Sequence, residues 1–372
     1  MQICEFNKCT GCFACQNVCP KNCISMTEKT LGHIYPVIDE SLCINCGACA
    51  RVCPRNEIPQ LLMPQAAYAT KSRKTEEYEN ASSGGLASVL SRKVLAEGGS
   101  VFGCGSDMEH GIKHIKIENE DDLWLLRGSK YVQSHINFMF REIKEELKKG
   151  KKVLFIGTPC QVGGLIKFLG KPYENLITAD LICHGVPSQK VLFEHLESIG
   201  TTGGKYITFR EKAGLYLRVT NSQGDTIYYT ESFDDDYYLG FLCDLTLRDS
   251  CHNCSFSRNE RCSDITIGDF WGLSPQAKIT KPHGISIALV NTEKGKALFD
   301  TCTDRLESEE RPLSEAFAGN TPLRCPVAPA KDRLKFISNY EKYGFKKASR
   351  RFLFKKRLRY KTIKLIQKIL HR

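Results

Sequence analysis

The sequence lacks long hydrophobic runs and an intact dinucleotide-binding glycine pattern. No run of about 18 consecutive apolar residues occurs, which excludes a bilayer-spanning helix. Cysteine and polar residues crowd the N-terminal region, where a signal peptide would be apolar, so we expect a cytoplasmic protein. The nearest match to G-x-G-x-x-G, residues 103–108, has methionine in place of its last glycine. We therefore expect no dedicated nicotinamide-binding domain.

Acidic residues are absent from the C-terminal segment. Residues 346–372 contain twelve Lys or Arg and no Asp or Glu, so the rest of the chain is close to neutral despite a net charge of +11. The apolar residues between them are spaced for one face of a helix. We predict a basic helical tail over residues 331–372 that contacts an anionic inner membrane surface, packs on a partner or packs on its own protein. No recognition motif accompanies it, so we expect no nucleic-acid binding.

Cysteine, in contrast, is abundant. The 372 residues include 19 cysteines within an otherwise ordinary globular composition of 41% hydrophobic and 26% charged residues. Without an export signal, this density of thiols predicts metal binding rather than disulfide bonds. The length corresponds to two or three domains.

Eight cysteines form an internal repeat with a shift of 34 residues. Each copy has the form C-x2-C-x2-C-x3-C-P, which is typical of bacterial two-cluster ferredoxins, where the fourth cysteine of each run ligates the other cluster. The sequence thus predicts two [4Fe-4S] clusters in a domain over residues 1–60, with residues 33–38 in a small hairpin. A zinc ribbon would instead need two C-x2-C pairs further apart. One predicted ligand set is Cys9, Cys12, Cys15 and Cys53, and the other is Cys43, Cys46, Cys49 and Cys19.

Residues 66–330 alternate between apolar runs and helical stretches, as in an α/β domain. Residues 153–156, 176–182 and 264–272 are the clearest strands, and a helix is expected from about residue 162 to 169. Alternation over residues 205–210 and 216–220 predicts a hairpin. The expected fold class is α/β, or α+β overall: a small ferredoxin module, a larger mixed-sheet α/β domain and a helical basic tail.

Four further cysteines stand where loops of this domain could meet. Cys160 and Cys183 follow predicted strands, at the edge where open α/β sheets bind ligands, and Cys251 and Cys254 form a C-x2-C pair. Convergence of the four predicts a third [4Fe-4S] cluster, although zinc or an inert pair also fits a single C-x2-C. Cys262 competes for one ligand position. The other six are expected to be small buried residues: Cys4, Cys23, Cys104, Cys243, Cys302 and Cys325.

Several short segments, in order, carry a family resemblance. They are SSGG at 82–85, GSKYVQS at 128–134, GTPCQ at 157–161, CHGVPS at 183–188, the C-x2-C at 251 and DITIGDFWG at 264–272. Over residues 1 to about 330 the chain resembles the beta-subunit family of coenzyme F-420 hydrogenase/dehydrogenase. The resemblance implies FAD, and one cluster held by Cys160, Cys183, Cys251 and Cys254, with Cys262 as a bystander. Methanogen-type members use the deazaflavin coenzyme, whereas GDFWG and CHGVPS resemble a bacterial branch whose substrates are mostly unknown.

In this context the expected FAD site is a serine–glycine turn that opens a helix. Its backbone N–H groups and the positive helix end suit a pyrophosphate. The predicted cofactor-binding residues are Ser82, Ser83, Gly84, Gly85, Ser129 and Lys130. Lys130 is also our candidate for stabilising negative charge on reduced flavin, and His184 for relaying a proton. The alternatives are a plain helix start at the turn, a surface lysine and a structural histidine.

Together these features predict an iron–sulfur flavoprotein oxidoreductase. It would pass electrons between an external one-electron carrier or redox partner protein, the clusters, FAD and an unknown organic substrate that takes two electrons. The alternative from another functional class is a non-catalytic electron-relay subunit of a larger complex. The sequence sets neither the substrate nor the direction of electron flow.

Overall fold

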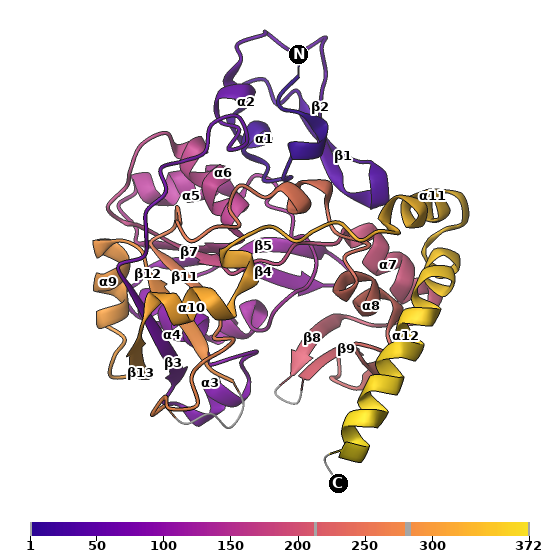
Figure 1. Cartoon of the computed structure of the whole chain (residues 1–372). Coiled ribbons are helices and arrows are strands. Elements are labelled where there is room, and N and C mark those ends of the chain that lie inside the picture. Colours follow the sequence, from indigo (N-terminus) through magenta and orange to yellow (C-terminus); the bar gives the residue numbers. More distant parts are fainter. Residues whose placement is uncertain (1, 212–213, 280–283, 371–372) are drawn as a thin grey trace.

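The computed structural model describes residues 2–211, 214–279 and 284–370, without the side chains at 364, 365 and 367–370. A small cysteine-rich N-terminal unit lies on a larger mixed α/β unit, and two C-terminal helices run along one side (Figure 1). The expected fold class is thereby confirmed. The structure contains the expected mixed sheet, the ferredoxin-like segment and the helical C-terminus.

The N-terminal unit is built from short elements around one antiparallel strand pair. Ile24 lies opposite Ile38, and Glu28 opposite Ile34. The hairpin expected at 33–38 supplies only the second strand, because the pairing strand lies earlier in the chain. Its elements are η1 (Phe6–Lys8), α1 (Ala14–Val18), β1 (Ile24–Glu28), η2 (Thr30–Gly32), β2 (Ile34–Ile38) and α2 (Ala48–Arg51).

The larger unit is centred on an eight-stranded sheet of order β13-β3-β12-β11-β7-β6-β4-β5. Its central strands β11, β7, β6 and β4 run parallel, so their carboxyl ends share one edge. The strands predicted near residues 153, 176 and 264 are thus confirmed as sheet neighbours. The bounds are β3 (Ala66–Ser72), β4 (Ser100–Asp107), β5 (Gly111–Ile117), β6 (Val153–Gly157), β7 (Leu176–Leu181), β11 (Ile265–Asp269), β12 (Ser286–Val290) and β13 (Leu306–Arg311).

Helices cover both faces of this sheet, which explains why the central strand β6 is apolar along its whole length. Leu154 faces a core with α4 and α9, whereas its neighbours Val153 and Phe155 face a core with α5 and α6. Phe13 and Ala14 of the N-terminal unit join that second core, so the two units share buried surface. The bounds are α3 (Thr75–Glu79), α4 (Leu86–Ala96), η3 (Glu120–Leu126), α5 (Met139–Lys148), α6 (Pro159–Leu169), α9 (Glu293–Asp300), α10 (Leu313–Gly319) and η5 (Thr321–Leu323).

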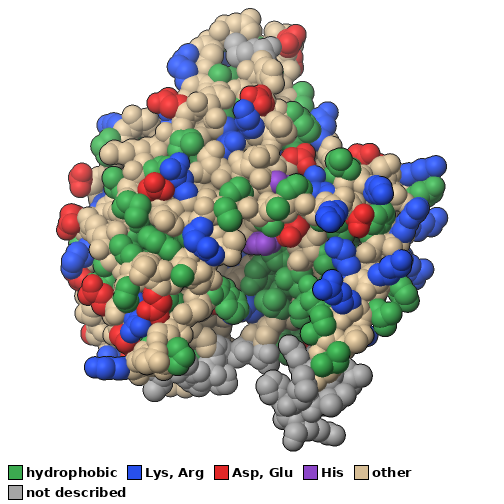
Figure 2. All heavy atoms as spheres, in the orientation of Figure 1, with side chains coloured by type: hydrophobic (Ala, Val, Ile, Leu, Met, Phe, Trp, Pro, Cys, Tyr) green, Lys and Arg blue, Asp and Glu red, His purple; other side chains and the backbone are tan. Residues whose placement is uncertain are grey.

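A second sheet and the remaining helices form a separate core. The expected hairpin is confirmed as β8 and β9, and β10 adds a third antiparallel strand. Tyr237 and Tyr238 are fully buried there. Figure 2 shows a hollow lined mainly by hydrophobic side chains, between the large unit and the side that carries α12. The bounds are α7 (Gln189–Ser198), β8 (Tyr206–Glu211), β9 (Gly214–Thr220), β10 (Thr226–Glu231), α8 (Asp236–Leu242), η4 (Asp249–Asn253), α11 (Arg333–Tyr343) and α12 (Phe345–Leu370).

The first part of the basic tail docks on its own protein. Phe345, Ala348 and Leu353 are buried, and Arg357 forms an ion pair with Asp236. Further along α12, apolar side chains are exposed, including Leu358 and Ile366; the side chains of Leu365, Ile369 and Leu370 lie outside the described residues. Within the described ranges, none of the helices combines the length and apolarity that crossing a bilayer requires.

Candidate functional site

The first recess of the N-terminal unit has a volume of about 320 Å³ and brings together four repeat cysteines. Gly11 (φ +62°) and Phe13 (φ +65°) adopt left-handed backbone conformations, which curl the loop around its own thiols. All four cysteines are buried: Cys9, Cys12, Cys15 and Cys53.

The second recess, of about 340 Å³, repeats this arrangement with Asn45 and Gly47 in left-handed conformations. Its cysteines are Cys19, Cys43, Cys46 and Cys49. The structure therefore groups the eight cysteines as crossed ligation requires. Cys46 is exposed and Cys43 partly so, which places the second recess nearer to solvent than the first.

The chemistry of both recesses fits a [4Fe-4S] cluster. Soft thiolates are its usual ligands, and burial raises the pKa of Cys12 to about 12, so a bound cation is needed to favour the thiolate. In the part of the chain that the structure describes, no three of these sulfurs lie within 4.8 Å of one another. Four thiolates at about 2.3 Å from one zinc ion would be closer together than that.

Each recess also contains a fifth cysteine, which the spacing of the repeat identifies only as an isolated residue. Cys4 lines the first recess, and its hydrogen bond is the main influence that lowers the pKa of Cys9 to about 6, with Arg248 contributing. Cys23 lines the second recess, with its Sγ 3.4 Å from that of Cys19. Neither cysteine belongs to the repeat, so spacing gave no signal for them.

Cys160 lies in the first turn of α6, a helix that begins earlier than the sequence suggested. Thr158 and Gln161 form a capping box, and Pro159 occupies the first helical position, where its missing N–H costs nothing. The sequence T-P-C-Q carries this signal, but the prediction placed these residues in the preceding loop.

Cys160, Cys183, Cys251 and Cys254 come together from the start of α6, the loop after β7 and the loop around η4. Burial raises the pKa of Cys160 to about 11 and that of Cys251 to about 12, and in both cases a negative charge on Cys254 adds to the shift. Burial, and then the other three thiols, raise the pKa of Cys183. The sequence predicted that these four cysteines would meet, but their meeting depends on the order of strands in the sheet. Their ligation of a cluster stays a prediction.

Two of these loops are joined by their backbones. The N–H of Arg248 donates to the carbonyl of Val186 at 3.0 Å. Gly185, at φ +146°, permits this approach, because a Cβ there would lie 3.3 Å from Cβ of Cys251. The segment that carries Cys251 is thereby fixed beside the segment that carries Cys183.

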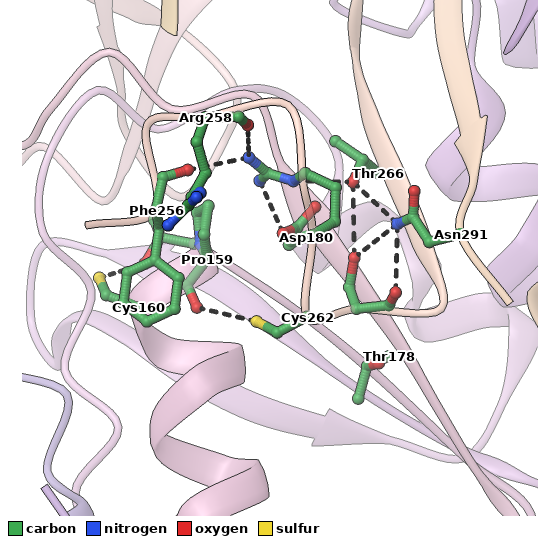
Figure 3. A network of polar contacts seen from close by, with 12 residues as sticks. Pro159, Cys160, Thr178, Asp180, Phe256, Arg258, Cys262, Thr266 and Asn291 are labelled. Atoms are coloured by element: carbon green, nitrogen blue, oxygen red, sulfur yellow. Dashed lines mark hydrogen bonds and ion pairs between the residues drawn. The ribbon is translucent and has the colours of Figure 1, made fainter. Parts of the chain in front are cut away.

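Cys262 lies beside these four cysteines, but its sulfur contacts a backbone carbonyl. Its sulfur points to the carbonyl of Pro159 at 3.8 Å, as Figure 3 shows. The adjacent Arg261 donates to Asp180 at 2.7 Å and to the carbonyl of Phe256 at 3.0 Å. This buried network positions the loop that leads from Cys254 back into β11. That Cys262 is a bystander stays a prediction.

The first recess lies against the helix that carries Cys160. A Cβ on Gly164 would lie 3.0 Å from both Cβ and Sγ of Cys12, so only glycine allows α6 to approach this closely. Cys12 and Cys160 are close enough for their charges to raise the pKa of Cys12, an effect smaller than that of burial. The three cysteine sets therefore lie in succession, from the exposed recess of Cys46, through the buried recess of Cys12, to the partly exposed set that includes Cys160.

The structure brings the two predicted flavin-binding segments together. The N–H of Ser129 donates to Oγ of Ser82 at 2.8 Å. Gly85 (φ +87°) caps α4, and a Cβ on Gly84 would lie 2.2 Å from the carbonyl oxygen of Thr70. The N–H of Gly84 already donates to Ser286 Oγ, so it is not available to a phosphate. A pyrophosphate at this turn would depend on the hydroxyl groups and on the start of α4.

Lys130 and His184, the two proposed catalytic residues, lie in different surroundings. Burial lowers the pKa of Lys130 to about 8, and its Nζ donates to the carbonyls of Leu126 and Arg127. His184 is 44% exposed in its side chain, with Nε2 2.8 Å from Oδ1 of Asp244. Among the described residues, no hydrogen bond or ion pair joins His184 to Lys130.

Sequence reasoning missed a buried polar group beside Lys130. His114 Nε2 donates to the carbonyl of Ile156, while Nδ1 accepts from Ser134 Oγ, which also accepts from Gln161. The carbonyl can only accept, which sets this tautomer. Burial, supported by the charge of Lys130, lowers the pKa of His114 to about 4. Nothing in the spacing of these residues indicated that they meet.

Comparisons with known proteins agree with this architecture. Residues 8–56 match the model of the 4Fe-4S dicluster domain, and residues 150–316 match the model for the C terminus of the coenzyme F420 hydrogenase/dehydrogenase beta subunit. The chain thus joins an iron–sulfur dicluster domain to a domain of the F420 hydrogenase/dehydrogenase beta-subunit family, and the resemblance seen in the sequence is confirmed.

Two named proteins are similar to this chain. The F420-dependent sulfite reductase of Methanocaldococcus jannaschii is 26% identical over 318 residues, which is 80% of this chain and 46% of that protein. This chain therefore spans about half the length of that curated relative. A chain of the F420-reducing [NiFe] hydrogenase complex of Methanosarcina barkeri, from a xenon-derivatised structure, is 20% identical with a TM-score of 0.46, covering 77% of this chain and 91% of that one.

Proposed function

We propose that the protein is an iron–sulfur flavoprotein oxidoreductase that connects a one-electron carrier to a two-electron organic substrate. The observation that carries the proposal is the succession of three cysteine sets, from the partly exposed recess of Cys46, through the buried recess of Cys12, to the strand ends at Cys160. When bound, [4Fe-4S] clusters exchange single electrons, and a flavin exchanges either one or two.

The chain's own residues have distinct roles in this proposal. Cysteine thiolates hold each cluster and set its distance from the next. Ser82 and Ser129, already hydrogen-bonded to each other, orient a flavin phosphate or ribose near the start of α4. Lys130 would supply a positive charge to a bound flavin, which becomes negative on reduction, and His184, oriented by Asp244, would donate or accept a proton at the substrate.

Cofactor content of the full chain, purified without oxygen, tests the proposal. We expect about twelve irons with matching sulfide, and one FAD per chain. About eight irons and no flavin would favour the alternative, a relay subunit whose chemistry resides on a partner. Absence of iron would reject both.

The electron donor and acceptor are tested separately. We propose reduced coenzyme F420 as the first donor to assay, because the related sulfite reductase depends on it. Methyl viologen serves as an artificial one-electron acceptor, so that the chain can be assayed without its redox partner. If dithionite bleaches the flavin and methyl viologen restores its spectrum, but reduced F420 is not oxidised, the search would turn to other organic donors.

We also propose peripheral contact between the distal part of α12 and an anionic membrane surface at the cytoplasmic face. Phe354, Leu358 and Ile366 are 66%, 59% and 50% exposed among the basic residues of the tail. The full chain is expected to sediment with phosphatidylglycerol vesicles but not with phosphatidylcholine vesicles. Leu358→Ser with Ile366→Ser should reduce sedimentation without unfolding the protein, since both side chains are exposed. Equal sedimentation of variant and wild type would reject the contact.

A further inference from the structure

Arg248 is fully buried, and its side chain contacts a different unit from the one that contains its backbone. Its backbone lies in the large unit, at the N-cap of the short helix η4 that contains Cys251. Its side chain reaches into the N-terminal unit, where it contacts the loop that begins the first cysteine run. It is the largest side chain among those with less than 2% exposure.

Every nitrogen of this guanidinium is engaged at the first recess. Nε donates to the carbonyl of Cys9 at 2.6 Å, and Nη2 to the carbonyl of Ile34 at 2.8 Å and to Sγ of Cys9 at 3.5 Å. Nη1 donates to Oε1 of Gln133 at 3.2 Å. The ring of Tyr35 stacks against the group, with its centroid 4.2 Å from Cζ.

Gly11 makes room for this contact. A Cβ at Gly11 would lie 3.0 Å from Nη1 of Arg248 and 2.8 Å from Nε2 of Gln133. Gln133 in turn donates to the carbonyl of Thr10 at 2.9 Å. The guanidinium and the amide together therefore hold the Cys9–Gly11 loop from the side of the large unit.

The charge of Arg248 is not balanced by a carboxylate. Among the described residues, no Asp or Glu forms an ion pair with it, whereas the buried Arg261 has Asp180 and Arg333 has Asp249. Burial of an unpaired cation is costly, so a nearby negative charge is expected. The Sγ of Cys9, a predicted cluster ligand, faces this cation at 3.5 Å from Nη2.

We infer that Arg248 is the counter-cation of the cluster held by Cys9, Cys12, Cys15 and Cys53, and that it raises the reduction potential of this cluster relative to that of the second recess. The inference rests on the proposed function, which assigns these cysteines to a [4Fe-4S] cluster. Uptake of one electron adds one negative charge in the first recess and breaks no bond. A fixed cation at 3.5 Å from a ligand sulfur stabilises this added charge. At equilibrium, an electron shared by the two N-terminal clusters would therefore reside mainly on the cluster beside the large unit.

An EPR-monitored titration with dithionite, on the full chain purified without oxygen, tests the inference. In Arg248→Met we expect one of the cluster signals to titrate at a more negative potential, with the other signals unchanged. At the wild-type midpoint, the ratio of reduced to oxidised cluster should fall at least tenfold, which is 59 mV for a one-electron couple. Arg248→Lys, which keeps the charge, should restore most of the wild-type value.

Arg333→Met separates charge from loop support. Arg333 donates to the carbonyl of Leu247 at 2.6 Å and thus holds the same loop without contacting Cys9. If Arg248 acted only as structural support, both variants would shift the potential equally, or neither would. Either result would overturn the inference.

A second pair of variants keeps the test decisive if Arg248→Met loses iron. Gln133→Glu and Gln133→Met both remove the hydrogen bond to Thr10, but only glutamate adds a negative charge beside the guanidinium. We expect a more negative potential in Gln133→Glu than in Gln133→Met, and equal values would overturn the inference. Wild-type protein with no iron at the N-terminal unit would instead reject the proposed function itself.

Discussion

The cysteines of the N-terminal unit and those of the large unit are brought together in different ways. The eight repeat cysteines lie within residues 9–53, and left-handed residues such as Gly11 and Gly47 fold each run around its own recess. Cys160, Cys183 and Cys254 are spread over almost a hundred residues. They meet because β6 and β7 are neighbours, and because the loop that starts at Arg248 pairs with Val186. A local motif specifies the first site, whereas tertiary topology specifies the second.

The largest expected effect tests the crossing of ligands between the two N-terminal recesses. Cys53→Ser should abolish the same EPR signal as Cys9→Ser and remove about four irons, because both thiols line the first recess. Cys19→Ser should instead match Cys43→Ser. Iron analysis and EPR on protein purified without oxygen provide the measurement.

Cys4→Ser is the matched control, since Cys4 lines the first recess outside the repeat. It should retain all the iron. Loss of the same signal in Cys53→Ser and Cys43→Ser would show that each run binds its own cluster, and would contradict the crossed assignment.

The corresponding test in the large unit is expected to affect one cluster and electron transfer to flavin. Cys183→Ser and Cys254→Ser should each remove about four irons and slow flavin reduction, while both N-terminal signals remain. Cys262→Ser should behave as wild type, because that sulfur faces the carbonyl of Pro159. If Cys262→Ser lost iron and Cys254→Ser did not, Cys262 would be the cluster ligand and Cys254 the bystander.

The two sites also differ in how far the sequence could predict them. Spacing alone was enough to group Cys53 with Cys9 and Cys19 with Cys43, because the motif folds locally. The strands before Cys160 and Cys183 were predictable from their apolar runs. Their pairing order, however, depends on side chains distributed over the whole sheet.

Contacts between distant segments were beyond sequence reasoning. Arg248 and Cys9 are 239 residues apart, and no pattern in the sequence indicates that their side chains meet. Cys4 and Cys23 were assigned to an inert role because they lie outside the repeat, yet they line the recesses. The start of α6 was misplaced for a different reason, since its capping box was present in the sequence.

The buried ion pair between Asp180 and Arg261 supports the large-unit site, whereas none of the described carboxylates pairs with Arg248. Asp180→Asn leaves the charge of Arg261 buried without a partner, so we expect a loss of about 3–5 kcal/mol in the free energy of unfolding. Urea titration without oxygen, followed by tryptophan fluorescence, measures it. Glu145→Gln, which removes an exposed carboxylate, is the control and should leave the midpoint unchanged. If Asp180→Asn left the urea midpoint unchanged as well, the ion pair between Asp180 and Arg261 would not be what holds the loop after Cys254.

The smallest predicted effect concerns acid sensitivity of the large unit through His114. In the folded chain its pKa is about 4, whereas an unfolded histidine titrates near 6.5, so only the unfolded state takes up this proton between those values. Stability from this group is therefore complete above pH 6.5 and is lost as the pH falls towards 4, by about 1.4 kcal/mol per pH unit at most. Lys130 is the charged group that faces it, and Cys104 lies opposite on β4. His114→Gln should flatten the change in the urea midpoint between pH 7.5 and 5.5 relative to wild type. Parallel curves would show that the acid sensitivity arises elsewhere, with the cysteine sets as the next groups to test.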